Sequence, residues 1–199
     1  MHGLKARAVG VLLAALLAPG LGALTVLHMT LGDLCENGHR IYRGTVIGSI
    51  ESTRVIGGAE IPVTTYRIRV DEAFKGEFVG TKGAAVVDLP TLGKSAPAEA
   101  GGAVRAVLLP EVPRLEIGAT YVLFTTRAAR TGLATTVGLG QGCFRVLGEG
   151  EKEIAINAFE NAGLFTGTSL EGAIAQGPVP YATLAGAIRA TLRTQQAGP

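Results

Sequence analysis

The sequence predicts a mainly β domain: a small antiparallel β-barrel with one short N-terminal helix and helices near the carboxyl end. Short segments that alternate apolar and polar residues are separated by glycine turns, and no alternation of strands with helices indicates a parallel sheet. The chain has 199 residues, of which 47% are hydrophobic. This length allows one domain with its own core, and the hydrophobic fraction is too high for a disordered chain.

The first 23 residues are typical of a secretory signal peptide. Lys5 and Arg7 precede an uncharged apolar run, Pro19 interrupts that run, and small residues follow up to Ala23. An uncleaved membrane anchor is the alternative, because about 20 apolar residues can span a bilayer. The break at Pro19 favours cleavage near Ala23. We therefore expect a secreted or periplasmic protein with no stable membrane insertion after signal cleavage.

Cleavage would leave an electrically neutral chain. The whole sequence has 18 Lys+Arg and 16 Asp+Glu, and residues 1–23 contain two basic residues and no acidic one. A neutral chain lacks the positive surface that nucleic-acid binding requires. Aromatic residues make up 5% and Trp is absent, so stacking on bases or sugars has little support. We expect no nucleic-acid partner and no cofactor.

The two cysteines, Cys35 and Cys143, are an even pair in a chain predicted to be exported. Disulfides persist in such compartments, so we expect a Cys35–Cys143 bond. The alternative is that Cys35 works with His39 as a nucleophile pair or as metal ligands. A structural metal needs four protein ligands and a catalytic metal about three, which the few histidines of the chain do not provide.

The first elements are predicted from local signals. Residues 30–37 form a short helix in which Thr30 is the N-cap, Asp33 completes a capping box and Gly38 ends the helix. A strand begins at Arg40, and after the turn signal Gly57-Gly58 the residues 61–74 alternate as a half-buried antiparallel strand.

The later elements follow the same patterns. Further strands are expected at residues 83–89, 119–126, 133–138, 143–147 and 153–159. Residues 90–115 are rich in Pro, Gly and Ala and indicate a long loop, which is uncommon unless it binds something or is mobile. Helices are expected at 169–176 and 181–195, the second with an apolar stripe of Leu184, Ile188 and Leu192. We divide the chain into a signal peptide (1–23), a barrel domain (24–160) and a C-terminal helical extension (161–199).

A possible binding face is formed by arginines on the polar side of the 61–74 strand. Arg67 and Arg69 share that side, and Arg40 and Arg43 could join them from the neighbouring strand. The alternative is that Arg67 pairs with Asp71 or Glu51 and only keeps the sheet face solvated.

No catalytic or metal-binding motif is present. Ser169 lacks the glycine spacing of a nucleophile elbow, and no His follows it. The glycine-rich residues 138–142 lead into a strand and not into a helix that could hold phosphate. The adjacent acids Asp71 and Glu72 should point to opposite faces of their strand. We therefore expect a protein that is not an enzyme.

Several segments together resemble a known family. RIYRGTVIGS, TYRIRVDEAFKG, PRLEIGATYVLF and VGLGQGCFRV, with the terminal ATLAGAIRATL helix, resemble a group of secreted bacterial proteins whose barrel is similar to the OB fold of netrin-like modules. The resemblance covers residues 30–147 and implies an OB-like barrel. Tissue inhibitors of metalloproteinases share that barrel.

Those inhibitors chelate the zinc of the protease through a Cys at the mature amino terminus. Here the expected mature start near Leu24 has no Cys. We therefore expect an exported non-enzymatic binding or interaction module for an unidentified protein or small ligand. A protease inhibitor, directed at metalloproteases and acting through a loop, is the alternative.

Overall fold

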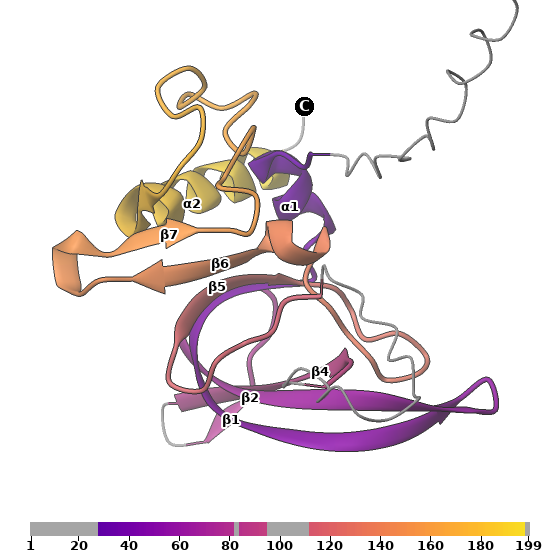
Figure 1. Cartoon of the computed structure of the whole chain (residues 1–199). Coiled ribbons are helices and arrows are strands. Elements are labelled where there is room, and N and C mark those ends of the chain that lie inside the picture. The colour runs from indigo at the N-terminus through magenta and orange to yellow at the C-terminus, as the bar shows by residue number, and fades with distance from the viewer. Residues whose placement is uncertain (1–27, 82–83, 95–111, 198–199) are drawn as a thin grey trace, which may run out of the picture.

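The computed structural model describes residues 28–81, 84–94 and 112–197, so the predicted signal peptide lies outside the described residues. Seven antiparallel strands form one curled sheet in the order β4-β2-β1-β5-β6-β7-β8, and a short β3 pairs with β4 at one edge (Figure 1). The strands are β1 (Arg40–Ile56), β2 (Ala59–Lys75), β3 (Gly80–Thr81), β4 (Ala84–Leu92), β5 (Thr120–Thr125), β6 (Cys143–Leu147), β7 (Ile154–Ile156) and β8 (Val179–Pro180). The α-helices are α1 (Leu31–Asn37) and α2 (Tyr181–Ala197), with short 3₁₀ turns at Leu139–Gly142 and Gly150–Lys152.

The mainly β architecture with two helices is confirmed, but the closed barrel is not, because the sheet is open. Among the described residues, no strand ladder joins β4 to β5. The gap is crossed by residues 133–137, which form a single bridge to β5 at Thr136 and one hydrogen bond to β4, from Ala134 N to Pro90 O at 2.9 Å. The predicted strand at 133–138 is therefore wrong, because these residues form one isolated bridge and no ladder.

β1 and β2 form a long hairpin closed by a two-residue turn. Gly57 and Gly58 have φ of +61° and +83°, which is the geometry of a type I′ turn and favours glycine at both positions. β-Bulges interrupt the pairing, and at Gly44 a Cβ would lie 2.6 Å from Ile68 Cγ2. The absence of a side chain at Gly44 allows the hairpin to curl. The predicted strand at 61–74 is confirmed, and β2 extends beyond it at both ends.

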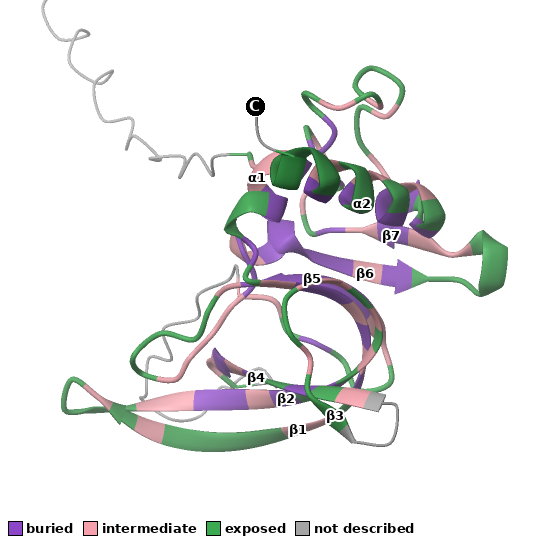
Figure 2. Ribbon diagram, turned by 180° about the vertical axis from the view of Figure 1, so that it is seen from behind, coloured by how far each residue is buried: buried purple, intermediate pink, exposed green. Residues whose placement is uncertain are grey.

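Two hydrophobic cores lie on opposite sides of the sheet. One lies between α1, α2 and the strands β5, β6 and β7, and it includes Leu34, Phe124, Phe144 and Ile188. The other fills the inside of the curl and includes Tyr42, Tyr66, Leu89, Leu123 and Cys143. Figure 2 shows the buried faces of α1 and α2 turned towards the sheet. We call them the helix-side core and the interior core.

The capping box of α1 is confirmed. Asp33 N donates to Thr30 Oγ1 at 3.2 Å, and Thr30 N donates to Asp33 Oδ2 at 2.8 Å. At the other end, Lys75 Nζ donates to the carbonyl oxygen of Cys35 at 2.7 Å, so β2 supplies the charge that suits a helix C-terminus. Gly38 ends the helix in an extended conformation with φ of −68° and not in the left-handed one.

The C-terminal helix is confirmed, and Leu184, Ile188 and Leu192 are buried as its stripe predicted. The helix predicted at 169–176 is wrong, since turns occupy this segment. Glycines with positive φ, including Gly167 and Gly172, interrupt helical backbone there. β8 extends the sheet beyond β7 and α2 packs in the helix-side core, while the domain division at residue 160 stays a prediction.

The remaining boundaries differ in detail. β4 continues to Leu92, so the expected long loop starts after it, and residues 95–111 of that loop lie outside the described residues. β7 ends at Ile156 because buried Asn157 and Asn161 redirect the chain through hydrogen bonds to each other's backbone. No helix within the described ranges is both long and apolar enough to cross a membrane.

Candidate functional site

The predicted Cys35–Cys143 disulfide is absent, and both thiols are free and buried. Cys35 lies on α1 in the helix-side core, whereas Cys143 faces the interior core from the other side of the sheet. The alternation of β6 is the physical reason, because Phe144 takes the helix side and so Cys143 must face away from it. Burial raises the pKa of each thiol to about 12. Among the described residues, no group of three or more potential metal ligands occurs.

The surface of β1, β2 and β4 that faces away from the interior core holds two of the predicted arginines. We call it the outer face. Its cross-strand rows are set by the register and consist of Thr45, Arg69 and Val86, then Gly48, Arg67 and Asp88, then Ile50, Thr65 and Pro90.

Arg67 and Arg69 both point to the outer face, but each is paired with an acid. Arg67 binds Asp88 through two hydrogen bonds of 3.0 and 3.3 Å, and not Asp71 or Glu51 as the sequence suggested. Arg69 Nε donates to Asp71 Oδ1 at 2.9 Å, and Thr45 Oγ1 donates to the same carboxylate at 2.7 Å. This face is therefore electrically balanced and offers little to an anion.

Arg43 belongs to a half-buried network at the edge of α2. Its guanidinium binds Glu153 at 2.9 and 2.6 Å and lies 4.4 Å from the ring centroid of Tyr181. The Tyr181 hydroxyl and Arg189 both bind Glu72. Burial, followed by the bond to Glu72, raises the pKa of Tyr181. This network ties the start of α2 to the sheet.

Asp71 and Glu72 were expected on opposite faces, and this is wrong. Both carboxylates bind groups on the outer side of the sheet, Asp71 with Thr45 and Glu72 with Tyr181. The cause is a β-bulge: the register passes from Arg43↔Glu72 to Gly44↔Val70 and leaves Asp71 without an opposite residue.

Arg40 does not lie with the other three arginines. It precedes Tyr42 by two residues on the interior side of β1, and its guanidinium lies 6.0 Å from the ring centroid of Phe78. Within the described part of the chain it makes no ion pair, and its Nε is buried without a hydrogen-bond partner. The four arginines thus form no single binding face.

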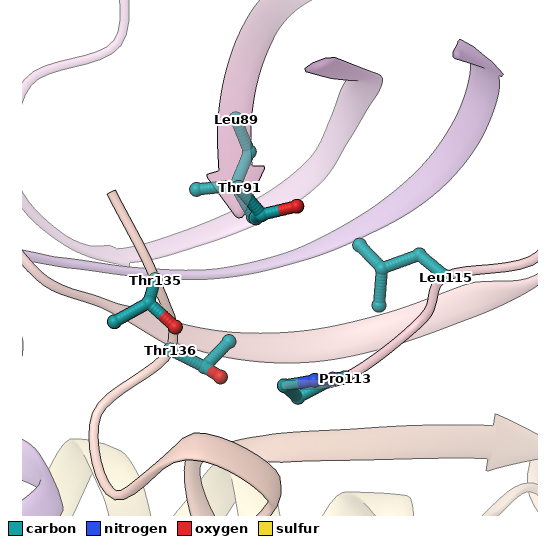
Figure 3. Close-up of a pocket in the computed structure, with 6 residues that line it drawn as sticks. All are labelled: Leu89, Thr91, Pro113, Leu115, Thr135 and Thr136. Atoms are coloured by element: carbon teal, nitrogen blue, oxygen red, sulfur yellow. The ribbon is translucent and has the colours of Figure 1, made fainter. Parts of the chain in front are cut away.

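A small hollow opens between β4 and the segments at 113–115 and 135–136 (Figure 3). Leu89, Thr91, Pro113, Leu115, Thr135 and Thr136 line it. It has room for about one water molecule. The Thr135 hydroxyl is buried there without a partner. The hollow can hold a water but not a metabolite.

The distal part of the β1–β2 hairpin, residues 48–64, is exposed along most of residues 50–60, and we call it the arm. β1 pairs with β5 only over residues 40–45, and Val46 adds backbone bonds to Gly118 and Ala119. From Ser52 to Ile56, no described residue forms a backbone hydrogen bond to the outer edge of β1. Figure 2 shows β1 exposed along this length.

The geometry of the turn determines which backbone N–H and C=O groups of β1 lie at that edge. Ile56 and Ala59 flank a two-residue turn and therefore exchange hydrogen bonds with each other. Counting back in steps of two from Val55, the N–H and C=O groups of Val55, Thr53, Glu51 and Ser49 point away from β2. Arg54 Nη1 donates to Thr131 O at 3.0 Å and holds the arm against a neighbouring turn.

Sequence reasoning missed the free edge of the arm, although the Gly57-Gly58 turn was a signal for it. It also missed the partners Asp88 and Glu153, for which no local signal exists. No protein-family model matches the chain, and neither the curated proteins nor the solved structures include a match to it.

Proposed function

We propose that the protein is an exported, non-enzymatic interaction module that binds an extended segment of a partner protein along the free edge of β1. The observation that carries this proposal is the outward-facing backbone of Thr53 and Val55, which forms no backbone hydrogen bond to another described residue and offers the hydrogen-bonding template of strand addition.

Main-chain bonds would provide affinity in this mode, and the side chains beside the edge would provide selectivity. Ile50 is 62% exposed and Val55 is 73% exposed, on opposite faces of the arm. We expect the bound segment to place apolar or β-branched side chains next to these two residues.

The arm is held in place before binding, which lowers the cost of ordering. On the β2 side of the hairpin, β2 pairs with β4 from Val63 to Arg69. On the β1 side, Arg54 donates a hydrogen bond to Thr131 O. On binding, conformational entropy would then be lost by the partner's segment but not by the arm.

A peptide-display selection on the purified mature protein tests the proposal. We expect β-prone peptides to be enriched, and their amide contacts to shift the NMR signals of Thr53 and Val55. Thr53→Pro removes one outward N–H without touching a hairpin hydrogen bond, whereas Thr53→Ala keeps that N–H and is the matched control. Selected peptides that bind Thr53→Pro as tightly as Thr53→Ala would contradict strand addition.

A second candidate is a protease inhibitor directed at metalloproteases, which rests on the expected likeness to netrin-like modules. The arm favours it because a rigid hairpin with a tight turn has the shape of a wedge for a substrate cleft. Assays against secreted metalloproteases decide between the two. Inhibition by the wild type that is lost in Val55→Lys would favour this second candidate over a general interaction module.

Export is tested separately by the intact mass of the protein in the exported fraction. We expect a mass that lacks residues 1 to about 23, as the signal-peptide pattern predicts.

A further inference from the structure

Where β2 ends, the chain turns back closely over the start of β1. Gly76 has φ of +97°, and a Cβ at this position would lie 2.9 Å from Arg40 Cγ and from His39 O. Only glycine permits this approach without strain. As a result, the link at residues 76–79 lies directly beside Arg40. We call His39, Arg40, Tyr42 and Phe78 the Arg40 corner.

Phe78 connects the polar groups of this corner. Its ring meets the ring of Tyr42 edge-on, with 5.4 Å between centroids and an interplanar angle of 72°. The Arg40 guanidinium lies 6.0 Å from the centroid of the same ring. Phe78 belongs to no strand, so its ring can move without breaking a backbone ladder.

Two buried donors at this corner have no acceptor. Tyr42 is completely buried, and its hydroxyl makes no hydrogen bond. Arg40 Nε is also buried and unpartnered. Native proteins rarely leave such groups unpaired, because their desolvation is then uncompensated. Of the four arginines predicted from the sequence, Arg43, Arg67 and Arg69 each have a carboxylate partner, and Arg40 has none among the described residues.

The charges around the corner favour an anion. Three positive charges lie close enough to influence His39: Arg127 just after β5, Arg40 on β1 and Lys75 at the end of β2. The negative charge of Glu77 has the opposite effect on His39. Desolvation and these three cations lower the pKa of His39, in that order of importance. Lys75 also donates to the carbonyl oxygens of Cys35 and Glu36. The corner therefore has donors and positive charge in excess of acceptors.

We propose that the Arg40 corner binds the carboxylate of a small organic acid, with its oxygens on the Arg40 guanidinium and the Tyr42 hydroxyl and its apolar part against Phe78. A single guanidinium matches a planar carboxylate in a fork geometry, and an aromatic wall suits a ligand with an apolar body. The Phe78 ring moves aside when the ligand enters, because it lies against both the Tyr42 ring and the Arg40 guanidinium in the free protein. This site lies outside the arm, so it does not depend on strand addition.

The test is a titration of isotope-labelled protein with sodium benzoate, sodium acetate and inorganic phosphate at constant ionic strength. We expect saturable shifts of the Arg40 Nε–H, His39 and Phe78 ring signals, with benzoate binding more tightly than acetate. Phosphate that binds more tightly than benzoate, or shifts that do not saturate with any of the three, would overturn the proposal.

Variants separate binding from folding. Arg40→Gln should abolish the saturable shift, whereas Arg67→Gln, which removes an arginine paired with Asp88, should leave it unchanged. Tyr42→Phe removes only an unpartnered hydroxyl, so the unliganded protein should be as stable as the wild type, while benzoate should bind about tenfold more weakly. Equal benzoate affinity in Tyr42→Phe and wild type, or in Arg40→Gln and wild type, would refute the assignment.

Discussion

The two buried thiols allow a quantitative prediction about cysteine reactivity. The thiolate is the reactive form, and the pKa of both Cys35 and Cys143 is raised from 9.0 to about 12, mainly by desolvation. At mildly alkaline pH, a rise of this size lowers the thiolate fraction by about a thousandfold. We therefore expect alkylation in the native protein to be at least ~1000-fold slower than in the unfolded chain.

The assay is intact-mass spectrometry after iodoacetamide treatment without reductant, with and without urea. Native protein should stay unmodified, and unfolded protein should gain two adducts. Cys35→Ala and Cys143→Ala, each gaining one adduct, assign the sites. An unfolded wild-type chain that gains adducts only after reduction would show a disulfide and refute the placement of the two cysteines in separate cores.

The same shift predicts the direction of a pH effect on stability. The folded pKa values lie above the unfolded value of 9.0, so the thiol contribution is fully present below pH 9.0. It is lost as the pH rises from 9.0 towards about 12, because the unfolded chain ionises its thiols and the folded chain does not. Urea unfolding of the wild type and the two alanine variants across this window measures it.

Three further predictions concern stability. Asn161→Ala removes the side-chain partner of Asn157 N, Ala155 O and Gly177 O and should cost about 3 kcal/mol. Asn161→Gly should be about 1 kcal/mol less costly because residue 161 has φ of +57°; equal urea midpoints of the two variants would refute the backbone contribution. Asp33→Ala should cost about 1 kcal/mol at neutral pH. Hydrogen bonds from Thr30 lower the pKa of Asp33 from 3.8. The contribution of Asp33 to stability is therefore present above pH 3.8 and is lost as the pH falls through the lowered pKa. Acid unfolding of the wild type and Asp33→Ala measures this loss. Glu153→Gln should cost about 2 kcal/mol by thermal unfolding and Asp88→Asn about 0.5 kcal/mol or less, since only the first leaves a half-buried arginine without its carboxylate.

Local signals in the sequence determined α1, the β1–β2 hairpin and α2. The capping box joins Thr30 to Asp33 three residues away, and the Gly57-Gly58 turn needs only its own backbone angles. The stripe of α2 repeats within the helix itself. Such features depend on interactions inside one element, so residue type and spacing are enough to specify them.

The tertiary structure alone decided whether the sheet closes and which charges meet. Residues 133–137 have an alternating pattern, but they form a single bridge, between Thr136 and Thr125, and no ladder. The partner of Arg67 is Asp88 because of the β2–β4 register, and the partner of Arg43 lies 110 positions away on the chain. A residue pattern does not contain the register between distant strands.

The cysteines and Arg40 show the same division. The sequence determined that Cys143 lies on a strand, but the side of the sheet that this residue faces depends on how β6 packs against the helices. Arg40 and Arg43 have the same charge and lie on the same strand, β1. Arg43 nevertheless binds the carboxylate of Glu153 on one side of the strand, whereas Arg40 lies next to Phe78 on the other side. The sequence by itself determined elements and their periodicity; packing across the sheet decided their partners, because those contacts join residues that are remote along the chain.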